Sequence, residues 1–226
     1  MIDLLYNHSS NVYSANGEDG INEYILKHLK LDSGVVLEIG AWDGFFDSNC
    51  ANLWSNGSYN GILIEATSKL NIADLESRYD NINCYRELIS SSNTLEDVID
   101  KCKFDVDEDN FVLASIDVDG DDLNVARSLG KYKPIILIVE PNGDVITKYN
   151  RNGSTIKELL DFGVDFGYDF LGMSGIAGRH GGNVYLIRND YKDKFHICSK
   201  PWQQRGIILS EGVFCLLYTS DAADEV

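Results

Sequence analysis

Short apolar runs alternate along the chain with segments in which apolar residues recur at every third or fourth position. A short apolar run bounded by polar residues is typical of a buried strand, whereas the longer period is typical of a helix with one buried face. The apolar runs predict strands at 35–39, 61–65, 82–86, 111–116 and 134–139. The helical period predicts helices at 21–29, 47–54, 68–78, 94–103, 121–129 and 155–166. Two further runs, 169–172 and 183–187, predict a closing hairpin.

The alternation of strands and helices indicates the fold class. Strands that are apolar on both faces belong to a parallel sheet covered by helices on both sides. We therefore expect an α/β fold, namely a Rossmann-like, doubly wound, mostly parallel sheet with a C-terminal antiparallel hairpin, in three αβα layers. No linker or shift of composition divides the chain, which predicts one domain over residues 1–214.

The last residues of the chain have a different character. Residues 215–225 resemble the translation of a sequencing adapter, of the kind found at the ends of metagenomic reads. We therefore expect residues 215–226 to be an artefactual tail and exclude them from the reasoning about the fold. On this interpretation the natural coding sequence stops near Phe214, and any later strand of the native protein is missing.

Four of the predicted strands end at an acidic residue, namely Glu38, Glu65, Asp117 and Glu140. In doubly wound sheets, ligands bind beyond the carboxyl ends of the strands. We therefore expect these acids to converge on a binding site. The alternative is that they cap loops or face the solvent. Two acids at consecutive strand ends around a glycine turn favour the binding interpretation.

The turn that follows the first strand indicates the kind of ligand. A dinucleotide site needs Gly-x-Gly-x-x-Gly, but Trp42 stands where the second glycine would fall and Asp43 where the diphosphate would lie. A carboxylate there suits the cationic S-adenosylmethionine, and Glu65 can accept hydrogen bonds from both ribose hydroxyls. We expect Trp42 itself to pack in the core under the following helix, and the alternative is that it stacks on the adenine or methionine part of the cofactor. The predicted cofactor-binding residues are Glu38, Gly40, Ala41, Asp43, Gly44 and Glu65.

The charge of the chain limits its partners. With 36 acidic against 19 basic residues, the net charge is −17, which repels phosphate backbones and anionic membranes. We therefore expect neither a nucleic acid nor a membrane as partner. The N-terminus lacks a basic start and a long apolar stretch, and no run approaches the 18 apolar residues of a membrane span. We expect a cytoplasmic protein without a signal peptide.

Several ordered motifs resemble one known family. The segment from Glu38 to Gly44 looks like motif I of class I S-adenosylmethionine-dependent methyltransferases. The wider set is similar to the FkbM-like methyltransferases over about residues 12–190. Ala15 and Asp121 depart from the Gln and Asn of the family pattern. The motifs are Ser14-Ala-Asn-Gly-Glu-Asp-Gly-Ile21, Ser115-Ile-Asp-Val-Asp-Gly-Asp-Asp122, Val139-Glu-Pro-Asn142, Gly153-Ser-Thr-Ile156, Gly167-Tyr-Asp-Phe-Leu-Gly172 and Gly182-Asn-Val-Tyr-Leu-Ile-Arg188.

The resemblance implies a methyltransferase that modifies an oxygen of a small molecule or sugar. Such an enzyme positions the acceptor and removes its proton. The candidate catalytic residues are Asp117 and Asp119 at the exit of the fourth strand, and His180 in a glycine-rich loop before the last strand. Turn formation is the alternative role for the two aspartates, and a surface position is the alternative for His180.

Two further alternatives remain open. Asp117, Glu140 and Asn142 supply oxygens at adjacent strand ends, which resembles the arrangement in metal-dependent catechol-type O-methyltransferases and suits Mg²⁺. Carboxylates at strand ends are common without a metal, so we do not favour Mg²⁺ as a cofactor. The other alternative is a non-catalytic Rossmann domain that binds S-adenosylmethionine or a nucleotide. A nicotinamide-dependent enzyme is disfavoured by Asp43 and the incomplete glycine pattern.

Overall fold

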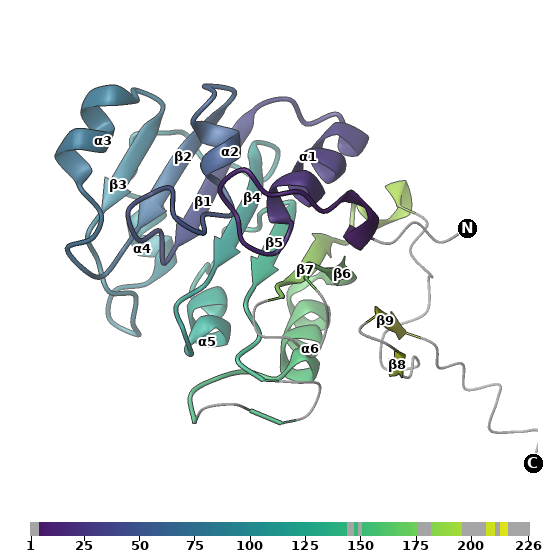
Figure 1. The fold of residues 1–226 in the computed structure, drawn as a ribbon. Coiled ribbons are helices and arrows are strands. Elements are labelled where there is room, and N and C mark those ends of the chain that lie inside the picture. Colours follow the sequence, from purple (N-terminus) through teal and green to yellow (C-terminus); the bar gives the residue numbers. More distant parts are fainter. Residues whose placement is uncertain are drawn as a thin grey trace, which may run out of the picture.

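The computed structural model describes residues 5–143, 147–148, 151–175 and 182–195, together with the backbone of 207–210 and 213–216. A seven-stranded sheet runs through the molecule in the order β3-β2-β1-β4-β5-β7-β6 (Figure 1). Neighbouring strands from β3 to β5 are parallel, and β7 is antiparallel to both β5 and β6. The expected fold, a doubly wound and mostly parallel sheet with a C-terminal antiparallel hairpin, is confirmed.

The strands of the large sheet have the following bounds: β1 Gly34–Ile39, β2 Tyr59–Ile64, β3 Ile82–Tyr85, β4 Phe111–Ile116, β5 Ile136–Val139, β6 Tyr168–Met173 and β7 Val184–Arg188. The helices are α1 Glu18–Leu29, α2 Ala51–Trp54, α3 Ile72–Arg78, α4 Leu95–Ile99, α5 Asp122–Arg127 and α6 Ile156–Phe166, with short 3₁₀ helices η1 Leu5–His8 and η2 Lys192–Lys194. A separate two-stranded ladder pairs β8 Ile207–Ser210 with β9 Val213–Leu216. That residues 215–226 are an artefactual tail stays a prediction.

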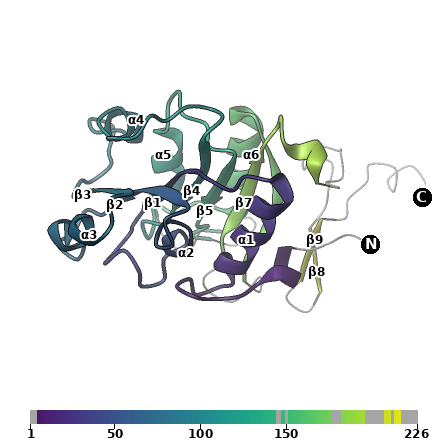
Figure 2. The same cartoon turned by 90° about the horizontal axis from the view of Figure 1, so that it is seen from above.

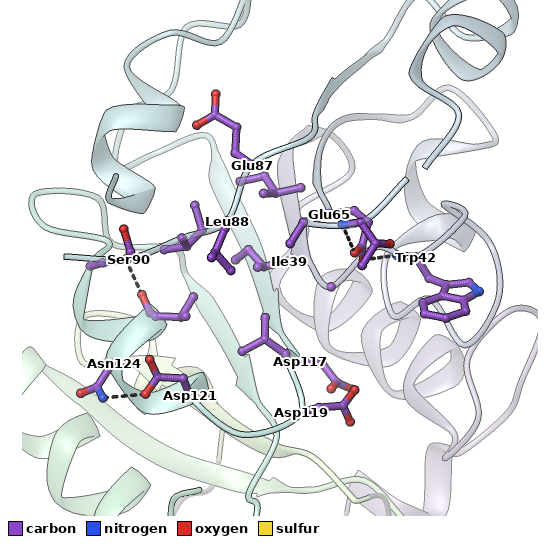
Figure 3. A pocket seen from close by; sticks show the side chains of 18 of the residues that line it. Ile39, Trp42, Glu65, Glu87, Leu88, Ser90, Asp117, Asp119, Asp121 and Asn124 are labelled. Atoms are coloured by element: carbon purple, nitrogen blue, oxygen red, sulfur yellow. Dashed lines mark hydrogen bonds between the residues drawn. The ribbon is translucent and has the colours of Figure 1, made fainter. Parts of the chain in front are cut away.

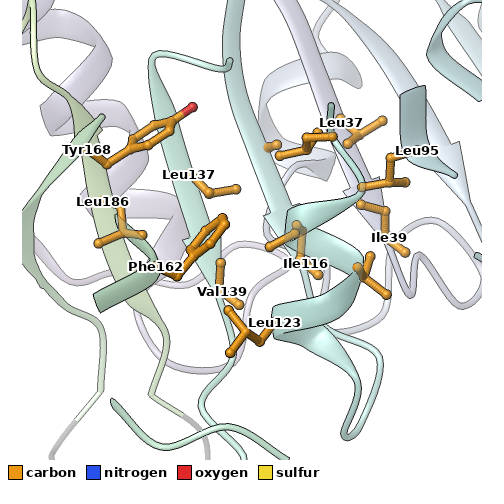
Figure 4. Packing of buried hydrophobic residues seen from close by; sticks show 14 of the residues in the cluster. Leu37, Ile39, Leu95, Ile116, Leu123, Leu137, Val139, Phe162, Tyr168 and Leu186 are labelled. Carbon is orange, nitrogen blue, oxygen red and sulfur yellow. The ribbon is translucent and has the colours of Figure 1, made fainter. Parts of the chain in front are cut away.

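Helices cover both faces of the large sheet, which gives the three expected layers. Helices α1, α2 and α3 lie on one face and α4, α5 and α6 on the other (Figure 2). Each face has its own apolar core, and the core under α4–α6 contains fully buried side chains such as Leu37, Ile116 and Leu137 (Figure 4). Because the sheet is buried on both sides, its strands read as continuous apolar runs in the sequence. Among the described helices, none has the length and apolar character that a membrane span requires.

Several helices begin later or end earlier than expected. Helix α2 was expected over 47–54 but starts at Ala51, because Asp47 has a left-handed backbone (φ 52°) that cannot continue a helix. The Ser48 hydroxyl accepts the backbone N–H of Ala51, the first residue of the helix. Helices α4 and α6 begin where the sequence indicates, since Thr94 and Thr155 each form a capping box.

A buried polar network holds the N-terminus of α1. Glu18 and Asp19 are 0% and 2% exposed, although acids in a first helical turn are ordinarily solvated. The Glu18 carboxylate accepts hydrogen bonds from the Ser174 hydroxyl at 2.6 Å and the Asn183 amide at 2.9 Å. Asp19 accepts three backbone N–H groups of residues 12–14. The segment therefore joins the start of the chain to the β6–β7 hairpin.

Candidate functional site

A cavity of about 1050 Å³ lies at the carboxyl ends of β1, β2, β3 and β4 (Figure 3). This is the edge of a doubly wound sheet at which ligands bind. The volume is at the upper end of the range for small-molecule sites, about 300–1,000 Å³, and leaves room for a cofactor together with a second molecule. Its walls come from the loops after the four strands and from the first turns of α5. The charged lining residues are Asp47, Glu65, Glu87, Asp117, Asp119 and Asp121.

Gly40 lines this cavity and brings two loops into contact. Its backbone has φ 80°, and a Cβ placed there would lie 1.7 Å from the carbonyl oxygen of Asp117. The group that comes close to Gly40 is thus the backbone of the loop after β4. The N–H groups of Gly40 and Ala41 donate to the carbonyl of Ile64, so both are used within the sheet. They are not free to bind a pyrophosphate.

Glu65, at the end of β2, is 6% exposed and lines the cavity. One carboxylate oxygen accepts the backbone N–H of Trp42 at 3.0 Å and the other accepts that of Thr67 at 2.7 Å. Each oxygen keeps a second lone pair, so the carboxylate can still accept hydroxyl groups from a ligand. The two backbone bonds hold it in place for that role. The predicted contact with the ribose remains a prediction.

Trp42 does not pack in the core, and that expectation is wrong. Its side chain is 44% exposed and lines the cavity, while the ammonium group of Lys69 lies 4.8 Å from the ring centroid. The cause is the backbone, which has φ 48° at Trp42. A left-handed residue turns its side chain away from the core that its neighbours face, and here it turns the indole toward the opening.

Three predicted cofactor residues lie outside the lining of the cavity. Ala41 is 2% exposed and packs in the core under α1 and α2. The Asp43 carboxylate accepts the backbone N–H groups of Phe45 and Phe46, which closes the turn. Gly44 has φ 95°, and a Cβ there would lie 3.1 Å from Leu75. The structure therefore gives Asp43 and Gly44 a role in shaping the turn and Ala41 a role in the core.

Glu38 is also buried, on the other face of the sheet. Alternate residues of a strand point to opposite faces, so Ile39 reaches the cavity while Glu38 points toward α2. Its carboxylate accepts the Ser48 hydroxyl at 2.5 Å and the backbone N–H of Asn49 at 2.6 Å. Burial raises the pKa of Glu38 to about 7, because the hydrogen bonds only partly offset the lost hydration. Glu38 holds the loop that leads into α2.

A second group of acids lies beside the cavity, at the ends of β4 and β5. Carboxylate oxygens of Asp117, Asp122 and Glu140 lie within 4.8 Å of one another. Burial and the charge of Glu140 raise the pKa of Asp117 well above its ordinary value, and Asp117 donates a hydrogen bond to Glu140. The Asn142 amide donates to Glu140 and to Asp122. The group can store a proton next to the cavity, and its oxygens are of the type that Mg²⁺ binds.

Asp117 and Asp119 both line the cavity, so the structure brings together two of the three candidate catalytic residues. Asp119 is exposed and has a left-handed backbone, with φ 57°. His180, the third candidate, lies outside the described residues. The structure also adds Asp122, which is 0% exposed and whose carboxylate accepts the N–H groups of Val118 and Gly120. Asp122 thereby fixes the loop that carries both candidates.

Sequence reasoning missed the wall formed by the loop after β3. Glu87 and Leu88 lie there, and Figure 3 shows Ser90, Asp121 and Asn124 at the end of the cavity away from Trp42. Glu87 follows the 82–86 run as a strand-end acid, a signal that could have found it. The hydroxyl and amide groups carried no such signal, because serine, threonine and asparagine are also ordinary loop residues. The polar residues of this wall are Ser90, Ser91, Thr94, Asn124 and Ser128.

Comparisons with known proteins were made for the sequence and for the backbone. No protein-family model and no curated protein matches the chain. Similar solved structures include the CMeT domain of the citrinin polyketide synthase (12% identity, 76% of this chain and 51% of that chain, TM-score 0.43). Others are an S-adenosylmethionine-dependent methyltransferase from Aquifex aeolicus (14%, 73% and 88%, TM-score 0.42) and the precorrin-6y C5,15-methyltransferase from Geobacter metallireducens GS-15 (16%, 79% and 90%, TM-score 0.40). At these identities and TM-scores the likenesses decide nothing about the chemistry of the site.

Proposed function

We propose that the chain is an S-adenosylmethionine-dependent methyltransferase that acts on an oxygen of a small molecule or sugar. One observation carries the choice of cofactor: among the residues that the structure describes, six carboxylates and no lysine, arginine or histidine line the cavity. Such a lining repels the diphosphate of a dinucleotide and attracts a ligand with a positive centre. The choice of oxygen rests on the motifs shared with the FkbM-like family.

The residues present fit this cofactor. Glu65 is held with two acceptor oxygens open to the cavity, which suits the two hydroxyls of a ribose. The hydroxyl and amide groups of Ser90 and Asn124, at the far end of the cavity, can pair with a base. When bound, S-adenosylmethionine supplies a methyl group attached to a positively charged sulfur. The negative charge of a carboxylate such as Asp119 favours binding of a positively charged sulfur over binding of an uncharged one.

The residues around Asp117 can handle the proton of the acceptor. Asp117 lines the cavity and donates its proton to Glu140 in the hydrogen-bonded pair. Since the pKa of Asp117 is raised, its ionised form is a stronger base than an ordinary aspartate. When Asp117 passes its proton to Glu140, its own carboxylate can take the proton of an acceptor hydroxyl, and the pair then holds both protons until one is released to water.

The proposal is tested by thermal unfolding with S-adenosylhomocysteine or NAD. We expect S-adenosylhomocysteine to raise the unfolding temperature and NAD to leave it unchanged. Glu65→Gln should weaken S-adenosylhomocysteine binding about tenfold or more, corresponding to the roughly 1.5–3 kcal/mol of a hydrogen bond to a charged group. Glu23→Gln, an exposed acid on α1, is the matched control. Stabilisation by NAD alone would refute the proposal.

Catalysis is tested separately from binding. The protein is incubated with methyl-labelled cofactor and a metabolite extract, with and without EDTA. Transfer of label to a metabolite supports a methyltransferase, and loss of transfer in EDTA that added Mg²⁺ restores would show that the reaction needs a divalent cation. Binding of S-adenosylhomocysteine without any transfer would favour the non-catalytic domain instead.

A further inference from the structure

One end of the cavity differs in character from the rest. We define the mouth as Trp42, Phe46, Asp47 and Asp119, which all line the cavity. Trp42 and Phe46 are 44% and 65% exposed, and exposed apolar side chains that gather at one place are typical of ligand-binding sites. Figure 3 shows Trp42 and Asp119 at the end of the pocket opposite Ser90 and Asn124. The mouth therefore lies away from the polar wall assigned to the cofactor base.

The mouth is built by two loops that touch. Trp42, Phe46 and Asp47 belong to the loop after β1, and Asp119 belongs to the loop after the neighbouring strand β4. The loops meet where Gly40 lies against the Asp117 carbonyl. Asp122 ties the second loop from inside through Val118 and Gly120. The rings and carboxylates of the mouth are thus presented by fixed backbone.

The acids of the mouth are available to a ligand. Within the part of the chain that the structure describes, the carboxylates of Asp47 and Asp119 accept no hydrogen bond and pair with no cation. Of the other lining acids, Glu65, Glu87 and Asp121 accept hydrogen bonds from backbone or side-chain groups, and Asp117 is paired with Glu140. An unpaired carboxylate in a cavity of like charges gains most from a cationic partner.

The chain already places a cation at the mouth. The ammonium group of Lys69 lies over the Trp42 ring, 4.8 Å from its centroid, at the distance of a cation–π contact. Lys69 is exposed and does not line the cavity. The indole therefore already contacts one ammonium group of the chain itself.

We propose that the mouth binds the methyl acceptor, and that this acceptor is a small molecule carrying an apolar ring and a protonated amine. The inference rests on the proposed function and narrows its substrate class. The rings of Trp42 and Phe46 contact the apolar ring of the acceptor, and Asp47 and Asp119 pair with its ammonium group. A carboxylate- or phosphate-bearing acceptor is disfavoured, because it would meet the carboxylates of the cavity while none of the described lining residues is basic and Lys69 lies outside the lining. A sugar would use the rings and leave the two carboxylates without a counter-charge.

The inference is tested with probes that share a shape and differ in charge. Binding of phenethylamine, 3-phenylpropionate, 3-phenylpropanol and methyl α-glucopyranoside is measured by ligand-observed NMR near neutral pH, with and without saturating S-adenosylhomocysteine. We expect phenethylamine to bind about tenfold more tightly than 3-phenylpropionate, because like charges face each other in the second complex. We expect 3-phenylpropanol to lie between them and the glucoside to be weakest.

Two substitutions remove the charge of the mouth and keep its backbone. Asn tolerates the left-handed backbone of Asp47 and Asp119 as Asp does, so the double variant Asp47→Asn/Asp119→Asn adds no strain. It should weaken phenethylamine binding about fivefold and leave 3-phenylpropanol unchanged. The exposed Asp165→Asn on α6 is the matched control and should change neither.

The outcomes separate this inference from the proposed function. Equal binding of the cationic and anionic probes, tighter binding of the glucoside than of the amine, or an unchanged double variant overturns the inference even when S-adenosylhomocysteine binds. Failure of S-adenosylhomocysteine to bind overturns the proposed function and, with it, the role of the mouth as an acceptor site. A preference for the amine that depends on Asp47 and Asp119 in the cofactor-loaded protein supports both.

Discussion

At the scale of single residues, the backbone conformations around the cavity are unusual. Four non-glycine residues have positive φ in the described structure, and three of them line the cavity: Trp42, Asp47 and Asp119. Each such residue is held at a cost of about 1–3 kcal/mol by its surroundings. The strain therefore gathers where exposed side chains are presented to a ligand. Gly40 avoids this cost, but its neighbours leave no room for another residue.

Gly40→Ala and Gly57→Ala form a matched pair. Both glycines have positive φ, 80° and 82°, but a Cβ at Gly57 meets nothing within 4 Å, whereas one at Gly40 meets the Asp117 carbonyl. We expect Gly57→Ala to lower the free energy of unfolding by about 1 kcal/mol through backbone strain alone. Gly40→Ala should lower the free energy of unfolding by about 4 kcal/mol, because the ends of β1 and β4 must separate to make room for the methyl group. Urea denaturation measures both, and equal losses would contradict the close approach.

At the scale of elements, α1 depends on acids that look like ordinary surface charges. Glu18 joins the first turn of α1 to Ser174 and Asn183 beside the hairpin, so the helix is fixed by its end as well as by its apolar face. The second carboxylate oxygen of Glu18 accepts the backbone N–H of Asn16. Three donors thus depend on one buried side chain.

Glu18→Ala is compared with Glu23→Ala on the same helix. Removal of Glu18 leaves three donors without an acceptor in the interior, and we expect a loss of about 3 kcal/mol or more in the free energy of unfolding. Glu23 is exposed, and its removal should change stability by less than about 0.5 kcal/mol. Thermal and urea unfolding measure the difference. Similar effects of the two substitutions would show that the network contributes little.

The sequence predicted the elements better than their ends. The strands were found because a strand buried on both faces is apolar throughout. The predicted start of α2 is too early, because the residue types around Asp47 do not indicate a left-handed backbone. The sequence also does not indicate toward which face of the sheet an acid at a strand end points. Glu38 and Glu65 look alike as strand-end acids, but only Glu65 lines the cavity. Which face of the sheet a given strand residue points to depends on strand pairing and packing. A short stretch of sequence does not carry that information.

At the scale of the whole molecule, the net charge of −17 and the six lining acids act in the same direction. Their summed field attracts cations to the cavity and is screened by salt. The simplest explanation of the acidic composition is solubility. Because of this field, the acidic residues also affect which ligands the cavity binds. It makes the charge of a ligand, and not only its shape, a determinant of affinity.

The field predicts a salt effect that differs between cofactor and product. S-adenosylmethionine carries one more positive charge than S-adenosylhomocysteine. Between about 20 and 500 mM salt the Debye length shrinks several-fold, which screens that charge from the lining acids. We therefore expect the affinity for S-adenosylmethionine alone to fall over this range. Calorimetric titration of both ligands at each salt concentration measures the ratio of their affinities. We expect the preference for S-adenosylmethionine to fall about threefold. A ratio that does not change with salt would mean that the lining acids are largely neutral.

The contacts of Glu18 also order events in time. Its partners Ser174 and Asn183 follow it by 156 and 165 residues. At a synthesis rate of about 5–20 residues per second, they emerge from the ribosome roughly 8–30 s after Glu18 itself. Throughout that interval only the N–H of Asn16, among the three donors to Glu18, is present. The two contacts that fix the start of α1 to the hairpin therefore form only after the hairpin has been synthesised.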